Sequence, residues 1–376
     1  MLNEKLYFRP VIVMAPGVIA GAEKVVLTGL HGLQEAGANP VMIIIKETRA
    51  PELAEKFKNL IDPSIETHFI ESKKAFDLQL PLNLKKVLVH IKGAVVLHSH
   101  GFKALIACYM AKANLKHIHT HHGNTGHTFK VKIYEKLAML TMKKCDVIVA
   151  VSEKMKKDLK KSLSPFENIV VIDNMLSLKN ADQIRAKRIE RYSNQVNILR
   201  KELIYIGRIS PEKGLCDFLT YFSSYDKRSL YHLTVIGDGP DKFKAQKIVE
   251  AKELATLVSF LGFITDPSKY LTKADLLILP SHREGLPMTL IEALCCGVPV
   301  IASDVGAISL LIKDKGNGKI VLIHDPNQWQ AALDEGLEHS EQWNDFALKD
   351  APNLQRQYSA NEWSRKTIDL YKKTLR

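Results

Sequence analysis

The sequence predicts an α/β protein with two domains, each a parallel sheet covered by helices on both faces. The chain has 376 residues, which is too long for one compact core and about right for two. Short apolar runs rich in β-branched residues alternate with amphipathic helical stretches through both halves. Because each run is apolar at consecutive positions, it is typical of a parallel strand buried on both faces.

The expected strands follow one another along the chain. They are residues 11–15, 40–45, 94–97 and 146–151 in the first half, and residues 203–206, 233–236 and 275–279 in the second. Between residues 174 and 200 the alternation lapses into a polar, charge-dense stretch, so we place the domain junction there. The predicted domains are residues 1–180 and 195–355, followed by a C-terminal helix within residues 356–376 that packs back toward the first domain.

The composition excludes several classes of protein. Apolar residues make up 46% of the chain and charged residues 25%, which is typical of a soluble globular protein rather than a disordered or fibrous one. No uninterrupted apolar run approaches the roughly 18 residues that a membrane-spanning helix needs. An apolar run after Lys5 and Arg9 imitates a signal peptide, but Pro16 and Gly17 interrupt it, which favours a strand followed by a glycine loop.

The positive charge is concentrated in the first half. Residues 1–180 carry 26 Lys and Arg against 16 Asp and Glu, a net +10, whereas the remainder carries 27 against 25, a net +2. The first domain is therefore expected to be attracted to phosphate-bearing or anionic membrane partners. We expect no nucleic-acid partner, because the chain has no zinc-finger spacing, RNP-type motif or Arg-rich arm. Five cysteines without a CxxC pair indicate reduced thiols in a cytoplasm.

Parallel sheets of this kind bind ligands at the carboxyl ends of their strands. Two common nucleotide motifs are missing from this sequence. There is no P-loop of the form GxxxxGK[ST], and the run Gly-Asp-Gly-Pro-Asp-Lys at residues 237–242 lacks the third glycine of the dinucleotide fingerprint. These observations disfavour both ATP hydrolysis and classical NAD binding.

A candidate phosphate site follows the strand at residues 203–206. The loop Gly-Arg-Ile-Ser-Pro-Glu-Lys-Gly at residues 207–214 turns between two glycines and carries Arg208 and Lys213. Two cations on such a loop can clamp a diphosphate, Arg through its planar fork and Lys as a point charge. A surface loop with two solvated cations explains this segment equally well on its own.

A second and more specific segment follows the strand that ends at residue 279. Glu284 and Glu292 stand with seven residues between them, the first in a loop and the second in the helix after it. Backbone N–H groups at Met288, Thr289 and Leu290 would lie at the amino terminus of that helix, which is a natural site for phosphate. A solvated helix face is the alternative, but the loop, helix and strand around this pair favour a binding site.

Three segments together resemble family 4 of the glycosyltransferases, which have the GT-B fold. They are residues 207–214, residues 235–240 (Val-Ile-Gly-Asp-Gly-Pro), and the Glu-x7-Glu block that ends in Gly-Val-Pro-Val-Ile-Ala-Ser-Asp-Val-Gly at residue 306. The resemblance covers nearly the whole chain. It implies two Rossmann-like domains facing each other across a cleft, a nucleotide-sugar co-substrate, retention of stereochemistry and no metal.

The resemblance also assigns roles in the second domain. Gly207, Arg208 and Lys213 would bind the donor diphosphate, and the two cations would offset the charge of the departing group. Glu292 would hold the ribose hydroxyls and Glu284 the hydroxyls of the transferred sugar. The remaining donor-binding residues implied by the resemblance are Gly262 and Phe263 near the base and Gly285, Leu286, Met288, Thr289 and Leu290 near the phosphate.

The first domain resembles the family more loosely. Residues 17–23 resemble its Gly-Gly-Ala-Glu loop, with Ala20 replacing the first glycine, and this implies a glycine loop on the acceptor side formed by Gly17, Gly21 and Glu23. His100 belongs to a His-x-His pair at a strand end. In the run at residues 119–123, His122 is the expected catalytic histidine and His121 the alternate. Between the domains, residues 174–177 keep only the asparagine of the family's Asn-Gly-Val-Asp.

Zinc is an alternative reading of the histidines at positions 119, 121, 122 and 127, because imidazole is a common zinc ligand. No Asp or Cys completes a known zinc spacing, so we expect no metal and no cofactor besides the sugar nucleotide.

The resulting hypothesis is a retaining hexosyl- or N-acetylhexosaminyltransferase that uses a nucleotide-diphosphate sugar, with a UDP-sugar favoured. The expected acceptor is a saccharide or lipid-linked saccharide of bacterial-type surface polysaccharide or lipopolysaccharide biosynthesis. We expect a cytoplasmic protein whose basic first domain associates peripherally with the inner face of an anionic membrane. The alternatives are an epimerase-like or phosphorylase enzyme of the same fold, or a non-catalytic subunit that binds sugar nucleotides.

Overall fold

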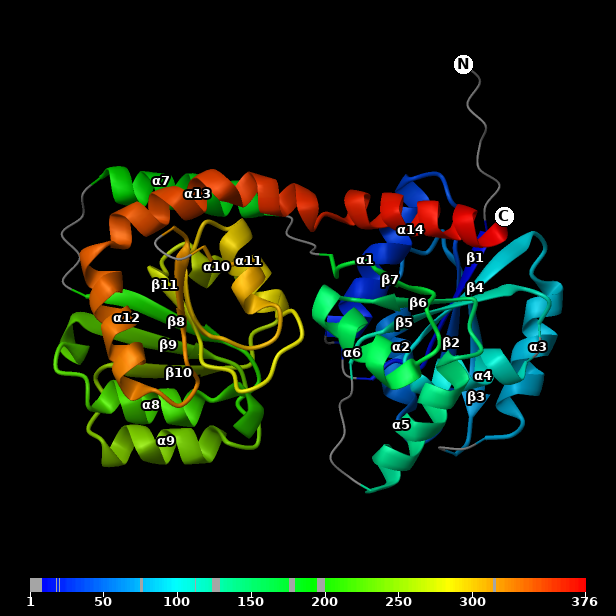
Figure 1. The fold of residues 1–376 in the computed structure, drawn as a ribbon, viewed down its shortest axis with the longest axis horizontal. Coiled ribbons are helices and arrows are strands. Elements are labelled where there is room, and N and C mark those ends of the chain that lie inside the picture. Colours follow the sequence, from blue (N-terminus) through cyan, green and yellow to red (C-terminus); the bar gives the residue numbers. More distant parts are fainter. Residues whose placement is uncertain are drawn as a thin grey trace, which may run out of the picture. The chain divides into compact units, whose positions relative to one another are not determined.

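A computed structural model of the chain describes residues 9–17, 19, 21–74, 77–111, 113–123, 129–175, 180–194, 200–313 and 316–376, with the backbone alone for residues 129–135. The chain divides into two compact units (Figure 1). The first contains Met1–Ser177 and Tyr358–Arg376, and the second contains Leu178–Gln357. Each unit is described by itself.

The described part of the first unit contains a seven-stranded parallel sheet with the order β3-β2-β1-β4-β5-β6-β7. Its strands are β1 (Arg9–Met14), β2 (Val41–Glu47), β3 (Glu66–Ser72), β4 (Ala94–His100), β5 (Lys116–His121), β6 (Val147–Ala150) and β7 (Ile169–Val171). Its helices are α1 (Gly21–Glu35), α2 (Pro51–Lys58), α3 (Leu80–His90), α4 (Phe102–Met110), α5 (Phe129–Met142), α6 (Glu153–Leu163) and α14 (Ala360–Leu375). The strand order reverses between β1 and β4, so the loops after these strands diverge at the carboxyl edge.

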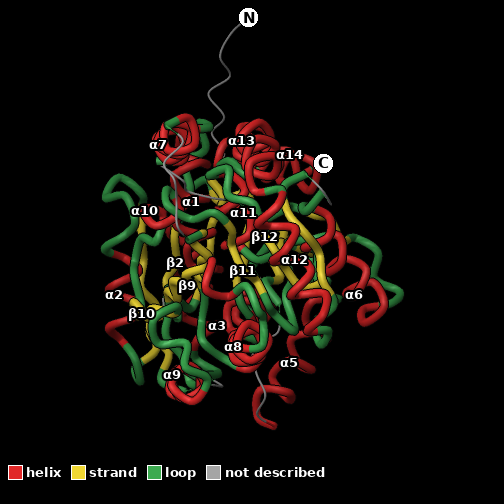
Figure 2. Tube along the Cα trace, turned by 90° about the vertical axis from the view of Figure 1, so that its left-hand side faces the viewer, coloured by secondary structure: helices red, strands yellow, loops and turns green. Residues whose placement is uncertain are grey.

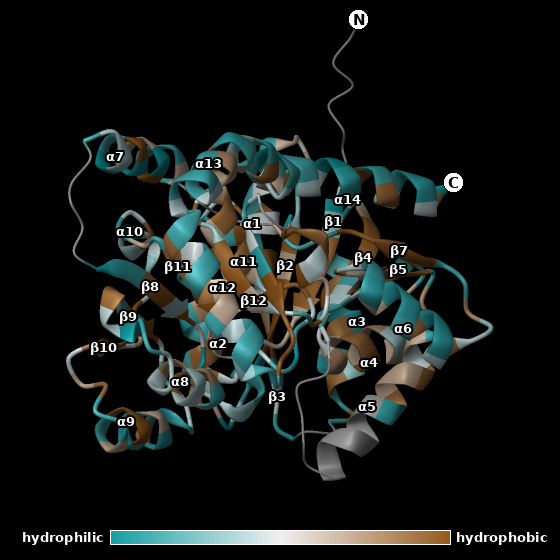
Figure 3. Cartoon of the chain, turned by 60° about the vertical axis from the view of Figure 1, so that its left-hand side comes forward, coloured by the Kyte–Doolittle hydropathy of each residue, from teal (hydrophilic) through white to brown (hydrophobic). Residues whose placement is uncertain are grey.

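The period-two alternation of the strands builds a core on each face of this sheet. Figure 2 shows the strands between helices, and Figure 3 shows that most strands are coloured as hydrophobic. On β1, Ile12 and Met14 join the core beneath α1, α2 and α14, whereas Val11 and Val13 join the core beneath α3 and α4. A Cβ at Gly29 of α1 would lie 2.8 Å from the indole of Trp363, so a small residue is needed where α14 packs on α1.

The described part of the second unit contains a six-stranded parallel sheet with the order β10-β9-β8-β11-β12-β13. Its strands are β8 (Lys201–Ile206), β9 (Tyr231–Ile236), β10 (Val258–Gly262), β11 (Leu276–Leu279), β12 (Val300–Ser303) and β13 (Gly318–Val321). Its α-helices are α7 (Ala181–Ser193), α8 (Leu215–Ser223), α9 (Lys242–Ala251), α10 (Ser268–Leu271), α11 (Met288–Cys295), α12 (Pro326–Glu338) and α13 (Ser340–Gln357). Short 3-10 turns are η1 (Pro211–Lys213), η2 (Arg228–Leu230) and η3 (Ile308–Leu310). The order reverses between β8 and β11.

Helix α7 lies within the polar stretch where the sequence pattern indicated only a junction. Its Arg188 has no exposed surface and donates to the carbonyl of Leu271 at 2.8 Å and also to the carbonyl of Ala274 and the side chain of Asn344. The helix therefore buries a guanidinium within the second unit in addition to its apolar Ala181 and Ile184. Among the described residues, no helix is long and apolar enough to cross a membrane.

Candidate functional site

Two loops meet at the carboxyl edge of the second sheet, where its strand order reverses. The loop after β8 runs through η1 to Gly214, whose φ of +66° is left-handed. A Cβ on Gly214 would lie 1.9 Å from the carbonyl oxygen of Pro280, so glycine permits direct contact with the loop after β11. The backbone N–H of His282 donates to the carbonyl of Glu212 at 2.9 Å and fixes the two loops together.

The loop after β9 packs against the same segment through two further glycines. A Cβ on Gly237 would lie 1.8 Å from the carbonyl oxygen of Gly207, and one on Gly239 would lie 2.2 Å from that of Ile209. The N–H of Ile209 donates to the carbonyl of Asp238 at 3.0 Å. The Gly-Asp-Gly-Pro run therefore holds the Arg208 loop in place.

These contacts bring two predicted site residues together. Lys213 Nζ lies 2.6 Å from Glu284 Oε1, and the hydroxyl of Ser281 donates to the same oxygen at 2.7 Å. The Glu284 side chain is only 8% exposed and that of Lys213 28%, so the ion pair is largely shielded from water. The sequence did not predict this pairing, because 71 positions separate the two residues.

Arg208 is exposed, and its backbone is fixed by Tyr205. The Tyr205 hydroxyl donates to the Arg208 carbonyl at 2.8 Å. Burial, with a smaller effect of the nearby Glu284 carboxylate, raises the pKa of Tyr205, so this phenol stays protonated as a donor. The loop therefore presents an exposed guanidinium on an anchored backbone.

The segment after Glu284 leads into the amino terminus of α11. A Cβ on Gly306, whose φ is +66°, would lie 2.4 Å from the Glu284 carbonyl oxygen and 2.6 Å from that of Gly285. The N–H of Ala307 donates to the Gly285 carbonyl at 2.9 Å. The loop that carries Glu284 is thus held from both sides, by Gly214 and by Gly306.

Helix α11 begins directly after Pro287, its N-cap residue. The amides of residues 288–290 belong to its first turn and precede the bond from Ile291 N–H to the Pro287 carbonyl. Leu286, Met288 and Thr289 are half-buried, and Leu290 is buried in the core. Glu292 is half-buried on the same helix, one turn further along. These amides form the positive end of the helix dipole.

The predicted base-contacting residues lie at the end of β10. Gly262 is left-handed, with a φ of +71°, and its carbonyl accepts from the N–H of Gly237 at 2.8 Å. The Phe263 side chain is 74% exposed. The end of β10 is thereby joined to the glycine loop that supports Arg208.

In the first unit, the glycine loop is joined to the first turn of α1. The N–H of Gly17 donates to Oε1 of Glu23 at 3.0 Å, and Glu23 is 8% exposed. Gly21 begins α1 and has no heavy atom within 4 Å of the place a Cβ would take. Ala20 lies outside the described residues, as do His127 and the junction residues 176 and 177.

Six histidines lie on β4 and β5 or directly after β5, and we call them the histidine array: His98, His100, His117, His119, His121 and His122. Within the array, His100 Nδ1 and His122 Nε2 share a hydrogen bond of 2.9 Å. His98 is hydrogen-bonded to the hydroxyls of Tyr371 and Thr120, both at 2.7 Å. Hydrogen bonds thus join two of these histidines to each other and a third to neighbouring hydroxyls.

Burial keeps the array neutral at pH 7. It lowers the pKa of His122 to about 4, with a smaller effect of His121, and it lowers the pKa of His121 to about 4 as well. The pKa of His100 falls well below its usual value for the same reason. The Nδ1 atom of His122 is buried without a hydrogen-bond partner among the described residues. His122 can therefore offer a ligand a neutral hydrogen bond, but not a fixed positive charge.

The zinc alternative finds no support in the described part of the array. There, no three ligand atoms lie close enough together to hold a metal ion. The described residues form one such group elsewhere, from Asp217, His282 and His324 of the second unit.

Two protein families match the chain. The family described as "Glycosyl transferases group 1" matches residues 187–349, and that described as "Glycosyltransferase Family 4" matches residues 19–179. The chain therefore belongs to family 4 of the glycosyltransferases and has the GT-B fold, as its three motif segments predicted.

Curated relatives include an uncharacterized glycosyltransferase of Haemophilus influenzae, 25% identical over 67% of this chain and 66% of the relative. A putative teichuronic acid biosynthesis glycosyltransferase of Bacillus subtilis, TuaC, is 28% identical over 72% of this chain and 70% of the relative. In a D-inositol 3-phosphate glycosyltransferase of Paenarthrobacter aurescens, the matched segment spans only 34% of the relative's own length.

A solved structure with a similar fold is that of Anabaena Alr3699/HepE in complex with UDP. It superposes with a TM-score of 0.78 over 97% of this chain and 100% of that chain, at 15% identity. At this identity the likeness establishes the shared fold.

Proposed function

We propose that this chain is a retaining glycosyltransferase that takes a hexosyl or N-acetylhexosaminyl group from a nucleotide-diphosphate sugar, with a UDP-sugar favoured. One observation carries the proposal: the largely shielded ion pair of Lys213 and Glu284, at 2.6 Å, beside Arg208 and the amino terminus of α11. Family membership supports the same reading.

The chemistry requires fixed positive charge at the leaving group. As the glycosidic bond breaks, negative charge grows on the diphosphate, and cations that are already in place stabilise that charge without reorganising. Lys213 would meet it as a point charge and Arg208 as a fork, while the amides of residues 288–290 would add the positive end of the α11 dipole.

Glu284 has two roles in this proposal. Its Oε1 accepts from both Lys213 and Ser281, so it keeps the ammonium in position before the donor arrives. We assign Oε2 to the hydroxyls of the transferred sugar. Glu292, further along α11, would hold the ribose, and Gly262 and Phe263 would contact the base.

The preference for uridine has one line of support, which is the similar Anabaena protein solved in complex with UDP. A thermal-shift panel of UDP, GDP and ADP with their sugar conjugates tests it. A nucleotide present at 100 times its dissociation constant stabilises the folded chain by about 2.7 kcal/mol. We expect UDP and UDP-sugars to raise the melting temperature. A shift with GDP or ADP alone would contradict the base preference, and no shift with any nucleotide would contradict the donor site.

We assign the acceptor to the first unit, as a saccharide or lipid-linked saccharide of surface polysaccharide or lipopolysaccharide biosynthesis. The Bacillus subtilis relative named for teichuronic acid biosynthesis supports this class. In the proposal the neutral His122 hydrogen-bonds to sugar hydroxyls, and Gly17, Gly21, Glu23, His100 and His121 line the acceptor side.

We also propose a cytoplasmic location and peripheral association of the first unit with anionic membrane. Helix α6 buries Leu159 and Leu163 and exposes Lys157, Lys160 and Lys161. Charges of this kind contribute about 1 kcal/mol each near an anionic surface and are screened by salt.

Co-sedimentation of the full chain with phosphatidylserine vesicles tests this association. Binding should weaken with salt and fall strongly when these three lysines are changed to Glu. The matched control changes three exposed lysines of the second unit, Lys227, Lys252 and Lys273, to Glu. Equal loss in both triple variants, or binding that salt does not change, would refute the assignment to the first unit.

A further inference from the structure

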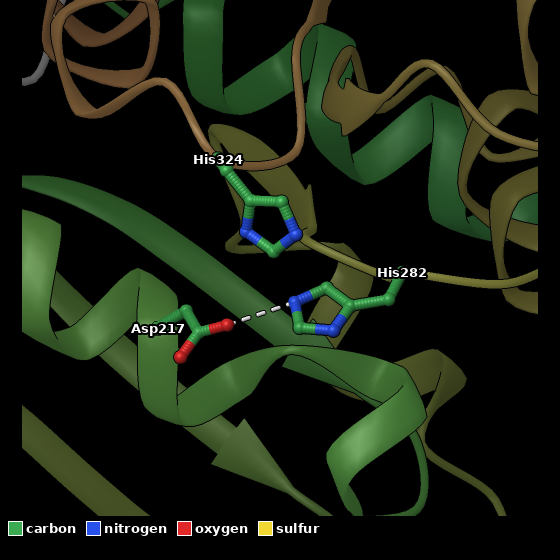
Figure 4. A group of neighbouring side chains, drawn as sticks. All are labelled: Asp217, His282 and His324. Carbon is green, nitrogen blue, oxygen red and sulfur yellow. Dashed lines mark ion pairs between the residues drawn. The ribbon is translucent and has the colours of Figure 1, made fainter.

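Three side chains from distant parts of the second unit converge beside α8 (Figure 4). Asp217 lies in the first turn of α8, His282 in the loop after β11, and His324 in the loop after β13. Their ligand atoms all lie within 4.8 Å of one another. The two imidazole ring centroids are 5.2 Å apart, with planes inclined at 64°.

An ordinary ion pair does not account for this group. Oδ2 of Asp217 lies 2.8 Å from Nε2 of His282, yet that nitrogen is a buried atom without a hydrogen-bond partner among the described residues. The carboxylate is therefore close to the ring nitrogen but outside hydrogen-bond geometry. The approach of Asp217 to His282 also leaves unexplained why His324, from a third segment, lies beside them.

Two of the three side chains are held by their surroundings, and the third is free to change its rotamer. His282 is held by its backbone bond to Glu212, and its Cδ2 lies 3.1 Å from the place a Cβ on Gly214 would occupy. Asp217 is fixed by α8, whereas His324 is exposed on its loop. Tetrahedral coordination with bonds of about 2.0–2.1 Å needs ligand atoms roughly 3.3 Å apart. A rotamer change of the exposed His324 can close the remaining distance.

We propose that Asp217, His282 and His324 bind a divalent transition-metal ion of the zinc class. Two imidazoles and one carboxylate suit Zn²⁺, Co²⁺ or Ni²⁺. Mg²⁺ and Ca²⁺ select sites built from oxygen ligands, so this group discriminates against them. The three protein ligands leave a fourth position for water.

The ion would act on structure rather than on glycosyl transfer. It would join α8 to the loops after β11 and β13, and the loop after β11 also carries Ser281 and Glu284. A metal here therefore stiffens the support of the proposed donor site without touching it. The site does not depend on the proposed function, because its ligands are separate from the donor-binding residues.

The test is titration of the untagged full chain with Co²⁺, followed by visible absorption, and with Zn²⁺, followed by calorimetry. We expect one ion per chain with the d–d bands of a site of low coordination number. His324→Ala should weaken binding at least about tenfold. His339→Ala is the matched control, since His339 is an exposed histidine of the same unit at the C-terminus of α12, and it should bind as the wild type does.

Asp217→Asn provides a second variant that keeps the size of the side chain, and it should also weaken binding. Far-UV circular dichroism confirms that each variant is folded. The proposal is overturned if the wild type has no saturable site, if His324→Ala binds as tightly as His339→Ala, or if equimolar Mg²⁺ displaces Co²⁺.

Discussion

Gly214 offers a test of the loop contact on which the candidate site depends. Gly214→Ala should destabilise the second unit through two separable effects. A left-handed φ of +66° costs an L-residue about 1–2 kcal/mol. The new Cβ would also lie 1.9 Å from the Pro280 carbonyl oxygen, a backbone atom that must move, and overpacking of this kind costs typically about 1–3 kcal/mol. The expected loss is therefore about 2–5 kcal/mol.

Gly262→Ala is the matched control in the same unit. Its φ of +71° imposes similar strain, but no heavy atom lies within 4 Å of its Cβ position, so the loss should stay at about 1–2 kcal/mol. In a unit of this size each kcal/mol shifts the melting temperature by about 2–4 °C. Thermal unfolding followed by circular dichroism should show a clearly larger shift for Gly214→Ala. Equal shifts for the two variants would refute the close approach of the two loops.

Three further predictions follow from the described contacts. Lys213→Ala should lower turnover by about 10² to 10³ with a small change in the donor Michaelis constant, whereas Glu292→Ala should mainly raise that constant. Steady-state kinetics of the two variants test this assignment, and the reverse pattern would show that the two roles must be exchanged. Because burial lowers the pKa of His121 and His122 from 6.5 to about 4, their contribution to stability is present above pH 6.5 and is lost as pH falls toward 4. The free energy of unfolding should therefore fall by up to about 1.4 kcal/mol per pH unit for each histidine, and a flat profile between pH 6.5 and 5 would contradict this. Arg188→Met should cost about 3 kcal/mol in denaturant unfolding by leaving buried carbonyls without a donor, against about 0.5 kcal/mol or less for the exposed Arg200→Met.

The apolar strands of both sheets could be predicted from the sequence, because their side chains enter cores on both faces. The expected runs at residues 11–15 and 275–279 correspond to β1 and β11. Strand β5 was not predicted. Its histidines stand at alternating positions, and two of them, His117 and His119, are buried with hydrogen bonds to the Ser99 hydroxyl on β4. Strand β3 is an edge strand with charged ends and a Phe69 that is 40% exposed, so its apolar signal is weak.

The composition of the candidate site was predictable, but its contacts were not. The motif segments indicated Lys213 and Glu284 as separate ligands of the donor. Their pairing depends on the approach of Gly214 to Pro280, which no spacing along the chain encodes. The group of Asp217, His282 and His324 was not predicted for the same reason, because its three residues follow three different strands.

Calorimetric titration of UDP into the wild type, Lys213→Met and Lys227→Met tests the central claim most directly. Lys227 is the matched control, because it pairs with Asp334 at 2.6 Å in the same unit but is 53% exposed. UDP carries the full negative charge that develops on the leaving group during transfer, whereas the intact donor does not. Loss of Lys213 should therefore weaken the binding of UDP more than the binding of the donor. The account predicts one UDP per chain, a dissociation constant raised at least about tenfold in Lys213→Met, or about 1.4 kcal/mol, and no change in Lys227→Met. Equal affinity in all three proteins would contradict it.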